Sequence, residues 1–297
     1  MNNQLGSLFI YLLRMLGLLP FISVQKLGSF FGRFFIKRNN RTVNAIDINL
    51  KLCLPEKTDA QRLDIRNARL EHMGQTALEM SYVWTKPKDQ IMALLKPENE
   101  KNAEFRAAVN SDDGVLVLAP HMGHWEMMNY YLAQYRPLTA MYRPVKNSEK
   151  LDAFIRGARE RAGSELVPTD RKGVMKLMKA LKGRGLVGIL PDQVPQDGGG
   201  VYVPFYGQQA YSMTLTSQLV NKTGAKAFIG AAFRVKGGYE VIMNPVDEGF
   251  YSDDIEESVA AMNRSIEQLA EHSLEQYQWE YKRFKKQPDG QSLYPRG

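Results

Sequence analysis

The sequence lacks the residues and motifs that several familiar chemistries require. Only one cysteine, Cys53, occurs among 297 residues, which excludes a disulfide framework or a cysteine-rich zinc site. That thiol lies far in sequence from the four histidines, which disfavours covalent thiol catalysis. The Gly-x-Ser-x-Gly, Walker A and His-Glu-x-x-His motifs are absent as well. What remains is direct proton abstraction by a histidine, without a covalent enzyme intermediate.

Acidic residues are outnumbered by basic ones, which gives a net charge of +7 and an isoelectric point near 9.3. Such a balance suits anionic lipid, nucleic acid or an acidic protein partner. Nothing else in the sequence supports nucleic-acid binding, so no nucleic-acid partner is expected. Hydrophobic residues make up 44% of the chain, which is enough for a sizeable core.

Residues 114–129 form the stretch around which the chain is organised. Val115–Leu118 is a short apolar run that predicts a buried strand, and Pro120 ends it. Gly123 allows a turn, after which apolar residues recur at helical spacing. The stretch therefore predicts a strand, a turn and a helix, with His121 at the carboxyl end of the strand, where open α/β sheets bind ligands.

His121 and Glu126 are the candidate catalytic pair of this stretch. A neutral imidazole accepts a proton near pH 7, and a nearby carboxylate can fix its tautomer and stabilise the imidazolium. The alternative is structural, with His121 capping the strand and Glu126 favouring a helix N-terminus. His124 is a further titratable residue that either packs locally or competes with His121 for Glu126. A metal site on these three residues is disfavoured, because no further ligand is placed by the sequence.

Residues 1–38 are predicted to be an N-terminal membrane anchor. Leu5–Val24 nearly supplies the about 20 apolar residues of a spanning helix, although Arg14 interrupts it and Pro20 breaks or kinks it. Aromatic and basic residues follow, which suits a membrane interface. Basic residues at 33–41 place the following domain on the cytoplasmic side. An ordinary buried pair of N-terminal helices is the alternative.

Residues 39–297 are predicted to form a single α/β domain with a mostly parallel central sheet flanked by helices, because strands and helices alternate. The expected strands are 115–118, 138–142, 166–168, 186–190, 227–233 and 239–243, and the longer expected helices are 58–85, 149–161, 174–181, 212–222 and 253–274. The connection 194–211 is interpreted as a lid or lipid-contacting flap, with a packed β-excursion as the alternative. In the tail, Trp279 and Phe284 are expected to dock, while Lys282, Arg283, Lys285 and Lys286 face anionic headgroups.

The segment His121-Met-Gly-His-Trp-Glu126 resembles the His-x4-Asp/Glu signature of the lysophospholipid acyltransferase superfamily. The wider pattern is similar to the lipid A secondary acyltransferases, the late lauroyl and myristoyl transferases of Gram-negative bacteria. The resemblance spans nearly the whole chain and also rests on Tyr142-Arg143-Pro144, Asn147, Leu151-Asp152, Arg159, Asp170-Arg171-Lys172-Gly173, Pro191-Asp192-Gln193, Val201–Gly207 and Trp279–Lys285.

This resemblance implies transfer of a fatty acyl chain from acyl carrier protein to a hydroxyl of an acyl chain on a lipid A precursor. His121 would be the general base and Glu126 would orient it. Arg159 and Asp192, with Arg143 and Asn147 as weaker candidates, would bind substrate or stabilise the transition state. Membrane lipids would be further partners. No metal or cofactor is implied, because the donor carries its acyl group on phosphopantetheine. The expected location is the bacterial inner membrane, with the catalytic domain on the cytoplasmic side.

Two other functions remain open at this point. One is an acyltransferase for another membrane lipid, a glycolipid or a lysophospholipid. The other is a membrane-bound lipid-binding or scaffold protein that has lost catalysis, although the intact pair of His121 and Glu126 argues against it.

Overall fold

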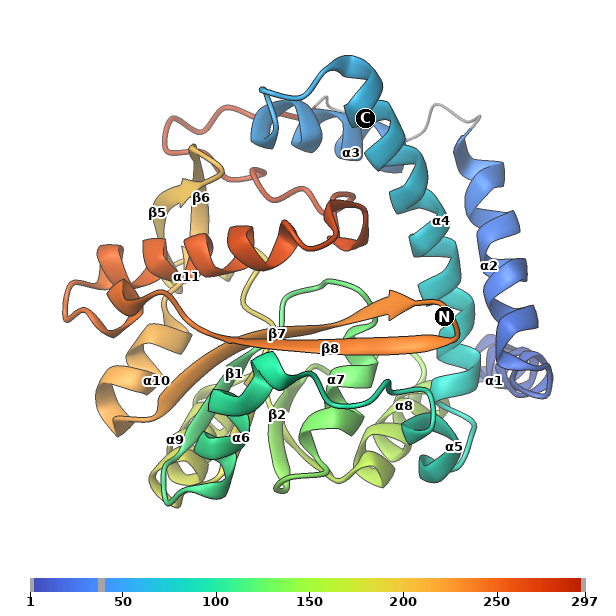
Figure 1. Ribbon diagram of the computed structural model, residues 1–297, viewed down its shortest axis with the longest axis horizontal. Helices are drawn as coiled ribbons and strands as arrows, with labels where there is room; N and C mark the ends of the chain where they lie inside the picture. Colours follow the sequence, from blue (N-terminus) through green and yellow to red (C-terminus); the bar gives the residue numbers. More distant parts are fainter. Residues whose placement is uncertain (1–2, 37–40, 295–297) are drawn as a thin grey trace.

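The computed structural model describes residues 3–36 and 41–294, and it is built on a six-stranded sheet in the order β3-β2-β4-β1-β7-β8 (Figure 1). Five strands are parallel, and β8 runs antiparallel to β7 across a tight turn. The strands are β1 (Val115–Leu118), β2 (Leu138–Tyr142), β3 (Ser164–Pro168), β4 (Leu186–Ile189), β7 (Lys226–Val235) and β8 (Gly238–Pro245). The predicted α/β fold with a mostly parallel sheet is confirmed.

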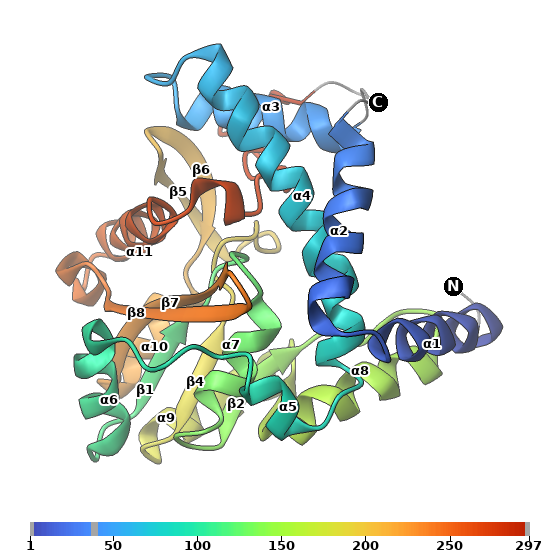
Figure 2. The same cartoon turned by 45° about the vertical axis from the view of Figure 1, so that its right-hand side comes forward.

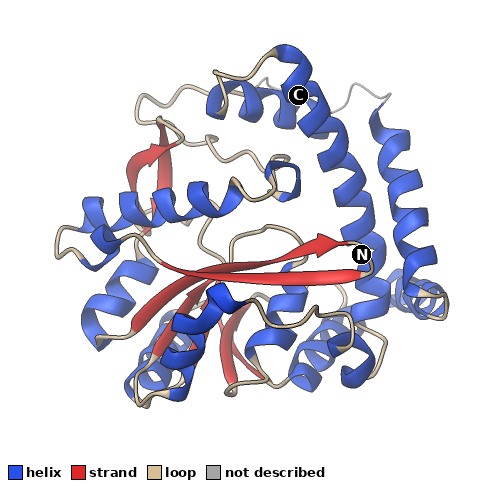
Figure 3. Ribbon diagram, viewed as in Figure 1, coloured by secondary structure: helices blue, strands red, loops and turns tan. Residues whose placement is uncertain are grey.

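Helices cover both faces of the sheet, as Figure 3 shows. The helices are α1 (Asn3–Gly17), α2 (Phe21–Ile36), α3 (Arg41–Cys53), α4 (Asp59–Val83), α5 (Lys88–Met92), α6 (Ala103–Asn110), α7 (Trp125–Leu132), α8 (Glu149–Ala162), α9 (Arg171–Lys182), α10 (Leu215–Thr223) and α11 (Ile255–Ala270). Three short 3-10 helices are η1 (Glu100–Asn102), η2 (Glu248–Tyr251) and η3 (Leu274–Gln276).

The alternation of side chains along β1 divides the core into two layers. Val115 and Val117 pack with residues of α6 and α7, whereas Leu116 and Leu118 pack with residues of α9, α10 and α11. All four are fully buried, which explains why the strand is uniformly apolar.

The apolar N-terminus folds as two helices, because Pro20 separates α1 from α2. Helix α2 stands beside α4, while α1 extends along α8 (Figure 2). Within residues 3–36 and 41–294, no helix is both long enough and apolar enough to cross a membrane. The expected boundary between anchor and catalytic domain, at residues 38 and 39, lies outside the described residues.

Three glycines allow α2 and α4 to approach closely. A Cβ atom on Gly28 would lie 2.5 Å from the Cα of Gln75, and one on Gly32 would lie 2.4 Å from the carbonyl oxygen of Leu70. From the other side, a Cβ on Gly74 of α4 would lie 2.3 Å from the carbonyl oxygen of Gly28. The two helix backbones are thus in direct contact, and no side chain fits between them.

Residues 194–211 do not form a flap over the surface. They contain most of an antiparallel hairpin of β5 (Gly200–Phe205) and β6 (Gln208–Met213). Val203, Phe205 and Ala210 are buried in the main core, so the packed β-excursion is the correct interpretation. The apolar residues of this segment serve the core of the domain.

The C-terminal tail corrects a second expectation. Trp279 and Phe284 are buried, as predicted. Arg283 was expected to face lipid headgroups, but it is 3% exposed and donates hydrogen bonds to the carbonyl oxygen of Tyr211 and the hydroxyl of Ser212. Its guanidinium fastens the tail to β6 and does not face solvent.

We predict that Gly74→Ala destabilises the protein by about 1–3 kcal/mol, because the added methyl group forces α2 away from α4. The matched control is Gly157→Ala in α8, where a Cβ meets no atom within 4 Å and the same substitution should stabilise by up to about 1 kcal/mol. Chemical denaturation of both variants measures the difference. Equal stability of the two variants would contradict the close helix contact.

Candidate active site

The register of two parallel strands brings His121 and Asp192 together. Leu118, the last residue of β1, pairs with Ile189, the last residue of β4. Beyond each strand the chain continues through a proline, Pro120 or Pro191. His121 therefore lies level with Asp192, although they are 71 positions apart in the sequence. Both side chains emerge at the carboxyl end of the sheet, which is where ligands bind in open α/β folds.

Asp192 accepts two hydrogen bonds from His121. The ring nitrogen Nδ1 lies 2.8 Å from Oδ1, and the backbone N–H donates to Oδ2 at 2.9 Å. With the Nδ1 proton directed at the carboxylate, Nε2 carries the lone pair. The amide nitrogen of Gln193 lies 3.3 Å from that Nε2 atom and 3.3 Å from Oε1 of Gln278. His121 is thus held in the tautomer that a general base requires.

Asp192 is 3% exposed, and burial alone would raise its pKa. The adjacent imidazole and backbone N–H of His121 outweigh this effect, so the pKa of Asp192 lies below its ordinary value. The carboxylate is therefore ionised at neutral pH and can stabilise an imidazolium that forms on His121.

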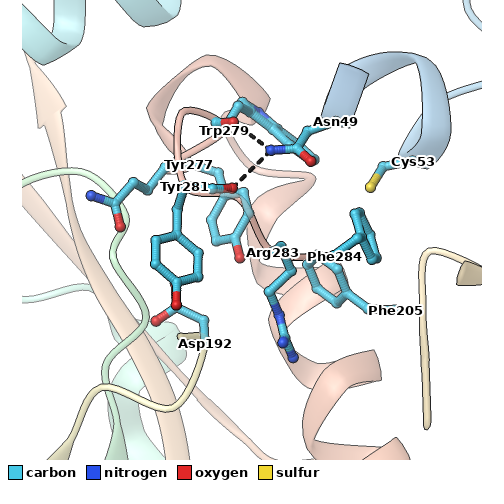
Figure 4. A pocket seen from close by; sticks show the side chains of 10 residues that line it. Asn49, Cys53, Asp192, Phe205, Tyr277, Trp279, Tyr281, Arg283 and Phe284 are labelled. Atoms are coloured by element: carbon cyan, nitrogen blue, oxygen red, sulfur yellow. Dashed lines mark hydrogen bonds between the residues drawn. The ribbon is translucent and has the colours of Figure 1, made fainter. Parts of the chain in front are cut away.

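The C-terminal tail closes a small cavity next to Asp192, as Figure 4 shows. Asn49 of α3 donates to the carbonyl oxygens of Trp279 and Tyr281 at 2.6 and 2.8 Å, which holds the tail in place. The cavity is about 10 Å³, which is about the least space that can hold one water molecule. Cys53 also lines it, and burial raises the pKa of this thiol far above its ordinary value. Cys53 is therefore a neutral core residue.

Glu126 does not contact His121, which corrects the pairing expected from the sequence. The carboxylate of Glu126, 3% exposed in the first turn of α7, receives hydrogen bonds from Nε and Nη2 of Arg159 on α8. Burial works against the charge of Arg159, but Glu126 raises its pKa above the ordinary value. The structure thus contains two pairs, His121 with Asp192 and Glu126 with Arg159.

The pair of Glu126 and Arg159 lies in the wall of an apolar pocket between α7 and the sheet. Trp125 also lines this pocket, and its ring centroid is 5.4 Å from that of His121. Deeper lining residues come from α7, β2, β3 and β4 and include Met128, Leu132, Leu138, Leu166 and Gly188. The pocket therefore combines an apolar interior with a charged pair and lies beside the imidazole.

Arg143 and Asn147 are placed differently from the other candidates. Both are exposed in the loop between β2 and α8, and the described lining of the apolar pocket does not include them. Asn147 has a φ of 63°, a conformation that asparagine tolerates better than most residues. Its conformation supports a turn role, and neither residue contacts the His121 pair among the described hydrogen bonds and ion pairs.

The turn between β1 and α7 is held by its own backbone. Gly123 donates to the carbonyl oxygen of Gln276 at 3.0 Å, and His124 donates to that of Ala232 at 2.9 Å. The carbonyl oxygen of His121 accepts from Gln278 at 3.1 Å. The N–H groups of Gly123 and His124 are thus engaged within the protein and are not available to bind a substrate oxygen.

His124 neither competes with His121 nor joins it in a metal site. Its ring is fully buried against Tyr239, with a centroid distance of 5.3 Å, and the nearest carboxylate oxygen is that of Glu79, at 3.9 Å. Burial lowers the pKa of His124 to about 4, so the ring is neutral near pH 7. His124 is thus a packed core residue.

The sequence interpretation missed the polar face of α4, because Arg69, His72, Thr76 and Glu79 resemble a solvated helix face. Arg69, Thr76 and Glu79 are buried, and Glu79 forms an ion pair with Arg234 of β7. The four polar residues are spaced three or four positions apart, which places them on one face of the helix and could have indicated a shared polar cluster. It also missed Gln193, whose position directly after Asp192 was the only clue.

The molecule is thus an α/β protein with a histidine–carboxylate pair beside an apolar pocket, at the carboxyl end of a mostly parallel sheet. Comparison with known proteins identifies its family. Residues 2–286 match the family described as bacterial lipid A biosynthesis acyltransferase. The chain belongs to this family.

Individual relatives agree with the family match. The chain is 27% identical to a lipid A biosynthesis lauroyltransferase of Escherichia coli K12, over 92% of this chain and 88% of that protein. It is 26% identical to a lipid A biosynthesis palmitoleoyltransferase of the same organism, over 92% and 89%. A lipid A biosynthesis acyltransferase of Haemophilus influenzae is 28% identical, over 93% and 89%.

We predict that the stability of the protein falls as the pH is lowered from about 6.5 towards 4. Burial lowers the pKa of His124 to about 4 and that of His72 to about 3, from an ordinary value of 6.5. Between these values the unfolded chain binds more protons than the folded chain, so acid favours unfolding. Thermal unfolding midpoints between pH 7.5 and 5 measure the effect.

The variant His124→Phe keeps an aromatic ring in the same space and should weaken this pH dependence. The matched control is His272→Phe, which removes an exposed histidine and should leave the dependence unchanged. An identical pH profile for His124→Phe and the unmodified protein would show that His124 is not buried in its neutral form.

Proposed function

We propose that the protein transfers a fatty acyl chain from the thioester of acyl carrier protein to a hydroxyl of an acyl chain on a lipid A precursor. The observation that carries this proposal is the hydrogen bond between His121 and Asp192 beside the apolar pocket of α7 and the sheet. The donor brings its acyl group on its own phosphopantetheine arm, so the enzyme needs no cofactor or metal. The basic surface of the chain favours approach of an acidic carrier protein.

In this mechanism Nε2 of His121 takes the proton of the acceptor hydroxyl while its oxygen attacks the thioester carbonyl. Asp192 orients the ring and stabilises the imidazolium, the role that the sequence analysis gave to Glu126. The proton on His121 then passes to the departing thiolate as the tetrahedral intermediate collapses. The ester forms and the thioester breaks without an acyl-enzyme intermediate.

The negative charge on the tetrahedral oxygen requires donors other than the occupied turn amides. The N–H groups of Trp125 and Glu126, which begin α7, and the guanidinium of Arg159 are donors in the wall of the pocket. Glu126 engages Nε and one terminal nitrogen of Arg159, which leaves donors of the guanidinium for substrate. Glu126 thus fixes the orientation of Arg159, and the apolar pocket accommodates an acyl chain.

The location that we propose is the inner face of the bacterial inner membrane, with α1 and α2 lying in the plane of the interface. These two helices and the turn between them expose large apolar side chains at Leu5, Leu8, Phe9, Tyr11, Leu12, Met15, Leu18, Leu19, Ile22, Phe30, Phe31 and Phe34. Exposed cations at Arg14, Lys26 and Arg33 lie among them. Such a mixture suits an interfacial helix on anionic lipid.

Mass spectrometry of lipid A tests the reaction. Cells that lack this protein should contain lipid A missing one acyl chain, and the unmodified gene should restore it. His121→Ala and Asp192→Asn should fail to restore it, because each removes the base or its correct tautomer. The control His272→Ala, at an exposed site, should restore it fully.

Each other outcome selects an alternative. Unchanged lipid A in the deletion strain would exclude the lipid A precursor as acceptor and direct the search to other membrane lipids. Restoration by His121→Ala would favour a scaffold protein over an enzyme. The mass difference itself gives the length of the transferred chain.

Membrane docking is tested by flotation with vesicles that contain phosphatidylglycerol. The triple variant Leu8→Asn, Leu12→Asn and Phe30→Asn should bind at least about tenfold more weakly, because each buried apolar side chain contributes about 1.5–3 kcal/mol. The control is Met175→Asn, which changes a 70% exposed residue of α9. Helix α9 lies away from α1 and α2 (Figure 2). Equal loss of binding in the control would argue against docking through α1 and α2.

A further inference from the structure

A cluster of buried charged and polar groups lies outside the catalytic pairs, between α4 and the sheet. Arg69, His72, Thr76 and Glu79 occupy one face of α4, and Arg234 of β7 meets them. Glu79 is 0% exposed and Arg234 is 8% exposed. Burying two charges costs desolvation free energy, so a buried ion pair seldom adds net stability. The pair of Glu79 and Arg234 is therefore a candidate for a functional role.

The contacts of Glu79 and Arg234 join three elements. Arg234 donates Nε to both carboxylate oxygens of Glu79, at 2.8 and 3.1 Å, and also donates Nη2 to it. It further donates to Oγ1 of Thr76 at 2.9 Å and contacts Nδ1 of His72 at 2.8 Å. From α2, Gln25 donates to Glu79 at 2.9 Å. The pair thus fixes β7 to α4 and α4 to α2.

The protonation states agree with this geometry. Burial would raise the pKa of Glu79, but Arg234 lowers it to about 2, so the carboxylate is ionised. Burial and Arg234 lower the pKa of His72 to about 3, so its neutral ring accepts the hydrogen bond from Arg234. The ion pair therefore consists of one anion, Glu79, and one cation, Arg234, next to the neutral imidazole of His72. The second cation of the cluster, Arg69, pairs with Glu280.

The backbone of Arg234 is tied to the segment that holds the catalytic turn. Its N–H donates to Oε1 of Gln276 at 2.8 Å, and its carbonyl oxygen accepts from Nε2 of Gln276 at 3.1 Å. The carbonyl oxygen of Gln276 in turn accepts from Gly123 at 3.0 Å and from Arg69 of α4 at 3.2 Å. Arg69 also pairs with Glu280, at 2.7 Å.

Three backbone hydrogen bonds of the turn 121–124 therefore reach two segments, β7 at Ala232 and the tail at 276 and 278. A further hydrogen bond joins the backbone N–H of His121 to Asp192. Helix α4 binds β7 through the ion pair of Glu79 with Arg234. It binds the tail through Arg69, which contacts Gln276 and Glu280. The ring of His124, the last residue of this turn, lies 3.9 Å from the carboxylate of Glu79. A shift of Arg234 would move both segments and, with them, the backbone that carries His121.

We propose that Glu79 and Arg234 are positioning residues for the catalytic turn, and that their buried ion pair fixes the backbone on which His121 stands. The pair touches neither the pocket nor the reacting atoms, so it acts through the turn. This inference rests on the proposed acyl transfer for its kinetic part, whereas the geometry of His121 can be measured without any substrate.

The experiment compares Glu79→Gln and Arg234→Lys with the unmodified full-length protein. Glu79→Gln removes the charge and keeps the shape, and Arg234→Lys keeps the charge but loses the fork that binds both oxygens. Each should lower kcat for acyl transfer by about 10- to 100-fold, the effect of a displacement of about 1 Å in a catalytic group, with KM changed by less than about threefold. Activity is expressed per folded molecule.

Histidine NMR gives the readout that does not depend on substrate. With 15N-labelled histidine the chain has four ring systems, and the loss of signals in His121→Gln assigns those of His121. Both ion-pair variants should shift or broaden the Nδ1 and Nε2 signals of His121. A purely structural role would lower the unfolding temperature and leave these signals in place.

The matched control is Ser258→Ala. Ser258 of α11 is fully buried and donates to the carbonyl oxygen of Phe250 at 2.6 Å, and neither residue belongs to β7, to the tail at 276–278 or to the turn. It should lose comparable stability but keep kcat and the His121 signals. If Glu79→Gln and Arg234→Lys behave like this control, the proposal is wrong. If the unmodified protein shows no acyl transfer but the His121 signals still move in these variants, the proposed function fails and the positioning role stands.

Discussion

The parallel pairing of β1 with β4 is the constraint on which the site depends. It pairs Leu118 with Ile189, the last residues of the two strands. Pro120 and Pro191 follow shortly after, and a proline cannot continue a ladder of hydrogen bonds. His121 and Asp192 therefore leave the sheet at the same level and in contact. A register shift of a single residue would turn one of these side chains to the opposite face and separate the pair.

The two buried carboxylates of the site, Asp192 and Glu126, each bind a different partner. Asp192 is bound to the imidazole of His121, and Glu126 is bound to the guanidinium of Arg159. Since each buried carboxylate has a partner of its own, neither competes for the other's partner, and His121 keeps one tautomer. Arg159 remains charged next to an apolar pocket, because Glu126 balances its charge where water is scarce.

The sequence predicted the sheet well because the strands are short, apolar and bounded by proline or glycine, as at Val115–Leu118. It also singled out His121, Glu126, Arg159 and Asp192, which the structure places in two pairs, His121 with Asp192 and Glu126 with Arg159. It assigned the partners wrongly because closeness in sequence favoured Glu126, whereas strand register, which is a long-range property, favours Asp192. Arg283 was misplaced and the buried polar face of α4 was missed for a related reason, since burial of a charge depends on partners from distant segments of the chain.

Long-range contacts also connect the apolar N-terminal helices to the turn that carries His121. Gly28 and Gly32 place α2 directly on α4, and Gln25 of α2 hydrogen-bonds Glu79. Helix α4 also holds the tail, through Arg69, next to the turn that carries His121. Because close-packed helices transmit displacement and do not absorb it, a lipid surface that fixes α2 would fix the orientation of the pocket as well. Under the proposed function, α2 would therefore influence both where the protein meets the membrane and how His121 is oriented.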